Sequence, residues 1–177
     1  MTDRASIRLA IRRPGPAAAA AVVLIVLLTA RLLFPASESD LSVVESAVVA
    51  GVIEGDTVEL EDQTRVRLLA VDAPEMGLEN GKPEPHAVAA TEWLQQELSG
   101  QRVTLRYGPR QTDAYGRRLA WIYDGEQQLI NEQLLRLGHA RLVMEFGLPD
   151  DLSAELHQAA AEAEASGRGL WSAKRSK

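Results

Sequence analysis

The sequence contains no cysteine and only three histidines. The absence of cysteine excludes a disulfide framework, an iron–sulfur or thiolate zinc site, and a cysteine nucleophile. The histidines, at positions 86, 139 and 157, show no spacing typical of metal ligands. An excess of basic residues is missing too, because the formal net charge is -6. Proteins that bind nucleic acid over a broad surface usually carry a Lys/Arg excess, so the chain as a whole does not fit that class.

The remaining composition is that of a folding globular protein, with 46% hydrophobic and 25% charged residues in a chain of 177. This length suits one ordinary domain and a tail. The charge is unevenly spread: residues 1–40 carry five arginines and three acids, a local +2, whereas residues 41–177 carry fourteen basic and twenty-two acidic side chains, or -8. Residues 102–118 nevertheless hold five arginines and one acid. A local basic strip can therefore exist within an acidic domain.

The N-terminal segment, residues 1–35, has the pattern of a signal peptide or an N-terminal membrane anchor. Four arginines precede an uncharged stretch at residues 14–30. Its apolar core is shorter than a standard span of about 20 residues, which favours a signal peptide. Apolar residues continue past Arg31, however, and we favour an uncleaved anchor. Either way the positive-inside rule predicts an extracytoplasmic protein of the bacterial cell envelope, membrane-anchored or secreted. Residues 36–42 then form a linker, and residues 173–177 a basic tail.

The rest of the chain alternates β-rich runs, turn signals and helical patterns. The predicted strands cover residues 43–50, 52–60, 65–71, 102–107 and 119–123. The predicted helices cover residues 85–98, 131–137 and 152–165, with Asn131 as the cap of the second. The expected fold class is α+β (mainly β): a five-stranded OB-fold β-barrel with three packed helices.

Three carboxylates and an arginine gather around turns and strand ends, namely Asp56, Asp72, Glu75 and Arg67. Oxygen ligands without Cys or His favour a hard cation such as Ca²⁺ or Mg²⁺, and a further carboxylate can activate water. Two guanidiniums can clamp a phosphate. The pattern favours phosphodiester hydrolysis, although solvated turn carboxylates would have the same spacing. On a straight strand Arg67 and Asp72 face opposite sides, so they converge only if the chain turns at Asp72.

Four segments, in this order, resemble the staphylococcal nuclease (thermonuclease) family. They are residues 52–58 (VIEGDTV), 67–75 (RLLAVDAPE), 112–123 (TDAYGR followed by LAWIY) and 169–172 (GLWS). The resemblance runs from about residue 43 to residue 172. It implies an OB-fold barrel and a Ca²⁺-dependent nuclease of DNA and RNA that leaves 3′-phosphate products.

The resemblance also implies residue roles. Asp56 and Asp72 match the metal carboxylates, and Ala73 sits where the family supplies a backbone carbonyl to the metal. Glu75 matches the general base. Arg67 and Arg117 match the phosphate-binding arginines.

Other positions concern the substrate. Tyr115 and Arg118 are substrate-binding candidates, with Tyr115 able to stack on a base. The sequence departs from the family pattern at four positions, where acidic, basic and aromatic side chains have changed: Glu54, Ala114, Met144 and Phe146. These departures concern base stacking and substrate preference more than the chemistry.

Two functions follow from these residues. The first is a monomeric, Ca²⁺-dependent endonuclease that cuts single-stranded or frayed DNA and RNA outside the cytoplasm, bound to the membrane if the N-terminal segment stays uncleaved. The alternative is a membrane-tethered module on the same fold that binds nucleic acid or protein without catalysis.

Overall fold

The computed structural model describes residues 44–77 and 81–176. The chain divides into two compact units, Met1–Leu41 and Ser42–Lys177, and the described residues belong to the second. The predicted N-terminal segment (1–35) and linker (36–42) lie outside the described residues, as do the side chains of the basic tail. Within the described part of the chain, no helix has both the length and the apolar character needed to span a bilayer.

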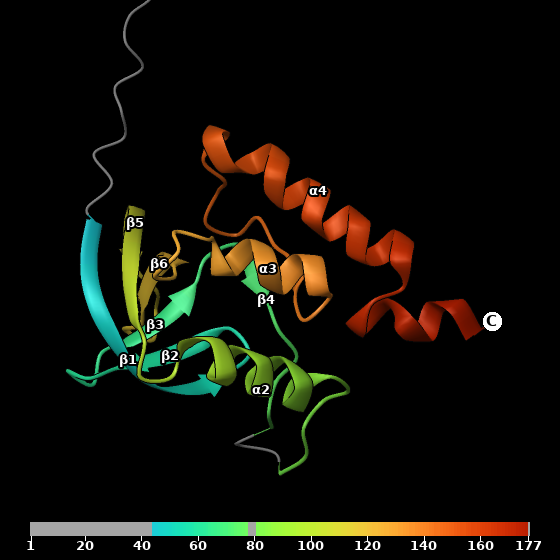
Figure 1. Ribbon diagram of the computed structural model, residues 1–177, viewed down its shortest axis with the longest axis horizontal. Coiled ribbons are helices and arrows are strands. Elements are labelled where there is room, and N and C mark those ends of the chain that lie inside the picture. Colours follow the sequence, from blue (N-terminus) through green and yellow to red (C-terminus); the bar gives the residue numbers. More distant parts are fainter. Residues whose placement is uncertain (1–43, 78–80, 177) are drawn as a thin grey trace, which may run out of the picture. The chain divides into compact units, whose positions relative to one another are not determined.

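Five strands form a closed barrel in the order β1-β2-β3-β6-β5 (Figure 1). They are β1 (Val44–Glu54), β2 (Thr57–Leu60), β3 (Arg65–Leu68), β5 (Arg102–Thr112) and β6 (Arg118–Tyr123). Antiparallel pairing of β1 with β5 closes the barrel, and β3 pairs with β6 in parallel. A separate small sheet pairs β4 (Val71–Asp72) with β7 (Arg141–Leu142). This arrangement confirms the predicted OB-fold barrel.

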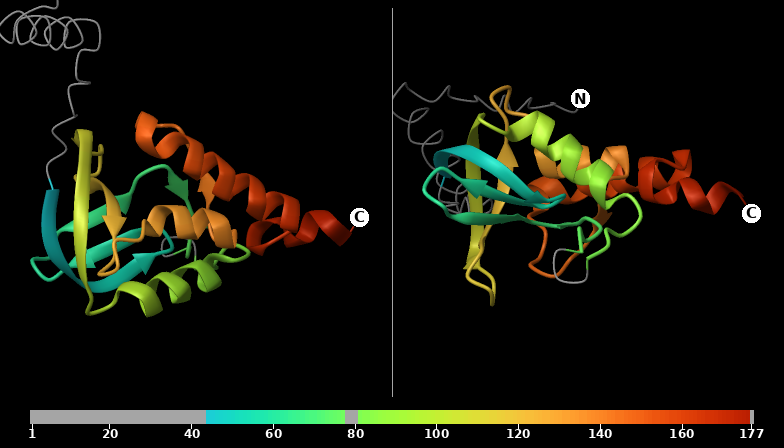
Figure 2. Two further views of the ribbon diagram at one scale, coloured as in Figure 1. Left: turned by 45° about the horizontal axis from the view of Figure 1, so that its top comes forward. Right: turned by 90° about the horizontal axis from the view of Figure 1, so that it is seen from below.

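Three α-helices pack around the barrel, as expected. They are α2 (Ala87–Leu98), α3 (Ile130–Leu137) and α4 (Asp150–Ser166), followed by the short 3₁₀ helix η1 (Gly169–Ser176). Helix α2 packs against β1, and α3 lies between the barrel and α4 (Figure 2). Glycines at positions 138 and 167 end α3 and α4 in the left-handed conformation, which is the usual role of glycine there.

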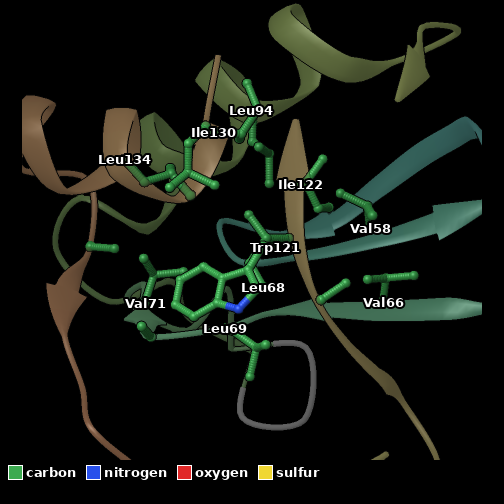
Figure 3. Packing of buried hydrophobic residues seen from close by; sticks show 14 of the residues in the cluster. Val58, Val66, Leu68, Leu69, Val71, Leu94, Trp121, Ile122, Ile130 and Leu134 are labelled. Atoms are coloured by element: carbon green, nitrogen blue, oxygen red, sulfur yellow. The ribbon is translucent and has the colours of Figure 1, made fainter. Parts of the chain in front are cut away.

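The core fills the barrel and the space beneath the helices. Trp121 lies beside Leu68 and Val71, and Ile130 and Leu134 of α3 face the same interior (Figure 3). Trp121 is 1% exposed and packs in this core. The apolar stripe of α2 is buried as well, because its members at positions 87, 90, 94 and 98 are all fully enclosed.

The first two predicted strands are bounded differently in the structure. The sequence predicts that one strand ends at Gly51 and another runs through residues 55 and 56. Instead β1 continues across Gly51 to Glu54, with register shifts on both sides of that glycine. Because β-bulges absorb the bend within a paired strand, Gly51 interrupts the register without ending β1. The chain reverses at residues 55 and 56 instead.

Asn131 is not the cap of its helix. Leu129 occupies the N-cap position of α3, and the Asn131 side chain is fully buried one turn further in. Its Oδ1 accepts a hydrogen bond from the Ile122 amide at 3.0 Å, and its Nδ2 donates to the Leu69 carbonyl at 2.8 Å. Asn131 therefore cross-links α3, β6 and the segment that follows β3.

Candidate active site

The turn between β1 and β2 buries Asp56. A Cβ atom on the preceding Gly55 would lie 2.7 Å from Ala90 Cβ and 2.8 Å from Ala73 Cβ, so only glycine lets this turn approach α2 so closely. Asp56 is 5% exposed, and both of its oxygens accept hydrogen bonds. Thr57 Oγ1 donates to Oδ1, and the Ala73 amide donates to Oδ2, each at 2.9 Å. The carboxylate thereby connects the β1–β2 turn to the chain beyond β4.

Arg67 joins two of the predicted carboxylates. Its Nη1 lies 2.7 Å from Asp56 Oδ2, and its Nη2 lies 3.3 Å from Asp72 Oδ1. Nη1 also donates to the Val71 carbonyl at 2.7 Å. The expected convergence of Arg67 and Asp72 is confirmed, but the chain does not turn at Asp72. It turns two residues earlier, at Ala70, whose φ of 60° is left-handed.

The Asp56 carboxylate carries charge that its neighbours offset only in part. Burial raises its pKa, whereas Arg67, the Ala73 amide and the Thr57 hydroxyl lower it, and the net direction is upward. The nearby charge of Asp72 adds to the rise. A cation at this position would relieve the cost of burying the carboxylate.

Glu75 lies at the surface beside a second carboxyl group. Partial burial raises its pKa, and a hydrogen bond with Glu54 and the negative charge of that residue raise it further. The Glu75 amide donates to Glu84 Oε2 at 3.3 Å, and its carbonyl accepts from the Glu84 amide at 2.9 Å. These bonds hold the backbone of Glu75 while its side chain faces solvent.

The loop between β5 and β6 is organised by Asp113. Its Oδ1 accepts from the amides of Tyr115 and Arg117, and its Oδ2 accepts from Arg117 Nε at 2.7 Å. Burial raises the pKa of Asp113, but the hydrogen bonds outweigh burial, so the net pKa is lowered. The Arg117 guanidinium lies over the Tyr115 ring at 5.5 Å, and Tyr115 is 87% exposed.

A cleft of about 820 Å³ brings these elements together. The lining includes Glu54, Thr57, Arg65, Glu75, Tyr115 and Arg117. Asp56 lies directly behind this wall, because its side chain is bonded to Thr57. The parallel pairing of β3 with β6 places the Arg67 strand beside the Arg117 loop.

Arg118 lies elsewhere and does not line the cleft. Its guanidinium is 2.8 Å from Glu45 Oε2 and stacks over the Tyr107 ring at 4.0 Å. Tyr107 Oη donates to the same Glu45 oxygen. Arg118 thus connects β6 to β1 and β5.

The oxygen donors fit a hard divalent cation, although the carboxylates alone do not enclose one. Among residues 44–77 and 81–176, no three His, Asp or Glu side chains cluster closely enough to hold a metal. Two carboxylates, Asp56 and Asp72, do lie near each other, because they contact the two terminal nitrogens of the Arg67 guanidinium. Ca²⁺ takes six to eight oxygen ligands, so backbone oxygens, water and substrate phosphate would complete its shell.

One residue of the site, Asp113, was assigned no role from the sequence. Asp113 appears there only as the single acid of an arginine-rich stretch. Its position before Tyr-Gly-Arg is the signal that could have identified it, because an Asp side chain commonly accepts amides two or more residues on. Asn131, which was predicted as a helix cap, carries no comparable signal for its cross-linking role, since its partner Leu69 is 62 residues away.

The fold and the cleft define a class: a small OB-fold domain whose carboxylates and arginines face a polar cleft. The staphylococcal nuclease homologue family matches residues 65–173. The chain is 36% identical over 131 residues to the thermonuclease of Staphylococcus intermedius, covering 72% of this chain and 76% of that protein. It is 32% identical over 128 residues to the thermonuclease of Staphylococcus hyicus, covering 70% and 74%. An uncharacterized endonuclease of Escherichia coli O157:H7 is 32% identical over 127 residues, covering 70% and 75%.

The chain therefore belongs to the staphylococcal nuclease homologue family. The family match begins at Arg65, and β1 and β2 before it complete the same barrel. Membership of this family and the endonuclease-named relatives support nuclease activity on nucleic acid.

Proposed function

We propose that this protein is a Ca²⁺-dependent endonuclease that hydrolyses phosphodiester bonds of DNA and RNA. The observation that carries the proposal is the position of Arg67, held between Asp56 and Asp72 beside a cleft that Glu75 and Arg117 line. Two carboxylates and an arginine thus lie beside a cleft lined by a candidate base and a second arginine, which supports a role in binding and cleaving one phosphate.

Each side chain has a role in this proposal. Asp56, Asp72 and the Ala73 carbonyl would hold Ca²⁺, which supplies positive charge next to the phosphate. Glu75 accepts a proton from the attacking water, and its raised pKa strengthens it as a base. Arg67 and Arg117 stabilise the charge that grows on the phosphate oxygens.

The proposed hydrolysis forms one bond to phosphorus and breaks another. The water oxygen forms a bond to phosphorus, and the bond from phosphorus to the 5′-oxygen breaks. The products are a 3′-phosphate and a 5′-hydroxyl, whose oxygen takes up a proton from solvent.

We also propose that the substrate is a single-stranded or frayed segment. Tyr115 is 87% exposed at the rim of the cleft, where it can stack on an unpaired base. A base within an intact duplex would not offer its face. The N-terminal charge pattern supports action outside the cytoplasm, with the membrane as a partner if the segment is uncleaved, and we propose a monomer.

The acidic surface favours a second candidate, a binding module without catalysis. Two arginines outside the cleft are paired with acids: Arg106 with Asp151, and Arg118 with Glu45. Such pairing reduces the positive charge available to attract a polyanion. Binding without turnover would identify this alternative.

The deciding experiment is digestion of single-stranded DNA and RNA by the purified full chain. Activity should require Ca²⁺ and vanish in EDTA. Glu75→Gln should lower kcat by about a hundredfold or more, because general base catalysis contributes about 10²–10⁴-fold. Glu92→Gln, an exposed change on α2, is the matched control and should retain full activity. Equal cleavage by Glu75→Gln, or no cleavage with any metal, would contradict the proposal.

A further inference from the structure

One part of the cleft lining has no role in the chemistry described above. This part of the lining consists of Gln63, Thr64 and Arg65, from the turn between β2 and β3 and the start of β3. These side chains can all donate hydrogen bonds. The acids that line the cleft, Glu54 and Glu75, come from β1 and from the segment after β4.

Strand geometry places Arg65 beside the two predicted phosphate-binding arginines. Arg65 and Arg67 are two residues apart on β3, so they share one face, while the intervening Val66 is fully buried on the other. In the parallel pairing of β3 with β6, Val66 is opposite Arg118. One residue back on each side are Arg65 and Arg117, and both line the cleft.

Arg65 is held much more loosely than its neighbours. Its Nε lies 3.7 Å from Glu59 Oε2, which is beyond hydrogen-bond range, and the two side chains are 63% and 39% exposed. Exposed ion pairs of this kind contribute little to stability. By contrast, Arg67 and Arg117 each contact a carboxylate at 2.7 Å. Arg65 can therefore leave Glu59 for a ligand at small cost.

The size of the cleft leaves room for a longer ligand. Its volume of about 820 Å³ is near the upper end of the range for ligand sites, about 300–1,000 Å³. Residues two apart on a strand are separated by about 6.6 Å, which is comparable with the spacing of successive phosphates in an extended single strand.

We propose that Arg65, with Thr64 and Gln63, forms a second phosphate subsite that binds the phosphate next to the scissile one. The proposal rests on the proposed nuclease function. Its consequence is that the protein prefers strands with at least two consecutive charged phosphates, and that Arg65 acts in substrate binding and not in the chemical step.

The test compares short single-stranded oligonucleotides with one central phosphodiester. The flanking linkages are either phosphodiesters or neutral methylphosphonates, and cleavage at the central bond is followed by mass spectrometry. For the phosphate-flanked strand, Arg65→Ala in the full chain should raise KM about five- to tenfold, with kcat within about twofold. For the methylphosphonate-flanked strand, Arg65→Ala and wild type should have equal kcat/KM.

Three further variants separate charge from structure. Arg65→Lys should recover most of the loss, and Glu59→Gln should lower KM slightly by releasing Arg65. Arg102→Ala removes one exposed positive charge at the start of β5, outside the cleft lining. This change should leave the preference for flanking phosphates unchanged. An equal defect of Arg65→Ala on both substrates, or an equal effect of Arg102→Ala, would overturn the proposal.

A binding measurement keeps this test independent of turnover. Fluorescence anisotropy with the same oligonucleotides reports binding affinity even if the wild-type protein cuts nothing. In that case the proposed nuclease function fails, but the phosphate subsite is still tested. Loss of one phosphate contact should reduce the slope of log affinity against log salt by about 0.7 for a single strand. An unchanged slope in Arg65→Ala would also overturn the proposal.

Discussion

Asp113 positions two residues at the rim of the cleft without lining it. Its two oxygens accept from the Arg117 guanidinium and from the amides of Arg117 and Tyr115. The carboxylate is thus a positioning residue. It fixes both the direction of a phosphate-binding side chain and the loop that carries a stacking candidate.

Changing Asp113 to Asn tests this role with minimal change in shape. The amide that replaces Oδ2 cannot accept from Arg117 Nε, while Oδ1 can still accept the backbone amides. We expect kcat/KM to fall by about tenfold or more, because a hydrogen bond to a charged group is worth about 1.5–3 kcal/mol. Steady-state kinetics on single-stranded DNA measures the effect.

Asp124→Asn is the control for that change. Asp124 accepts the amides of Glu126 and Gln128 through Oδ1 in the turn after β6, a similar geometry outside the cleft lining. Its substitution should leave kcat/KM unchanged. Equal losses in the two variants would mean that Asp113 acts only through stability.

Among the secondary-structure elements, helices α2 and α4 were predictable because their burial follows local periodicity. The inward positions of α4, Leu152 and Leu156 among them, follow the 3.6-residue period and are buried. Gly51 and Asn131 were misinterpreted because their roles depend on partners in other elements. Gly51 pairs with Glu59 of the neighbouring strand β2, and Asn131 bonds to Ile122 of β6 and to Leu69, 62 residues away. Local propensity contains no information about such pairings.

An ion pair joins β5 to α4. Arg106 Nη1 lies 2.7 Å from Asp151 Oδ2, and Nη2 donates to Oδ1 at 3.4 Å. Asp151 lies in the first turn of α4, where negative charge also stabilises a helix. The hydrogen bonds from Arg106 lower the pKa of Asp151 below its ordinary value of 3.8.

The stability contributed by this pair should depend on pH. Because the folded state lowers the pKa of the carboxyl, the contribution is fully present above pH 3.8 and is lost as pH falls through the lower folded value. At pH 7, Asp151→Asn should reduce the free energy of unfolding by about 0.5–1 kcal/mol, a value kept small because the side chain is 57% exposed. Urea unfolding at pH 7 and near pH 2.5 measures the difference.

At the acid pH the two proteins should have nearly equal stability. Glu155→Gln, an exposed change one turn later on α4, is the control and should show a smaller effect at pH 7. If Asp151→Asn lowered the free energy of unfolding equally at both pH values, the side chain would stabilise the contact between β5 and α4 through its shape and not through its charge.

Across the whole molecule, the net charge limits how tightly nucleic acid can bind. Residues 41–177 carry -8, and three arginines outside the cleft are paired with Asp151, Glu45 and Glu132. We therefore expect the arginines at the cleft to supply most of the affinity. The sequence located Arg67 and Arg117 through family motifs, whereas only the parallel pairing of β3 with β6 brings the Arg117 loop beside Arg65.

The salt dependence of activity should report this small number of contacts. Three phosphate contacts on a single strand give a slope of log affinity against log salt of about -2, since each contributes about -0.7. Raising KCl tenfold should therefore lower kcat/KM by about a hundredfold, measured on single-stranded DNA at fixed Ca²⁺. A flat response would contradict direct phosphate clamping.

The closure of the barrel by β1 and β5 also affects how the chain folds during its synthesis. Residues 44–48 of β1 pair with residues 102–106 of β5, so the first strand of the barrel lacks this partner until some 58 more residues have been synthesised. At about 5–20 residues per second, that wait lasts about 3–12 s. During it, one edge of β1 is open to pairing with other chains. The nascent chain is therefore most prone to aggregation before translation reaches β5. A ribosome pause within the codons for α2 would prolong that period.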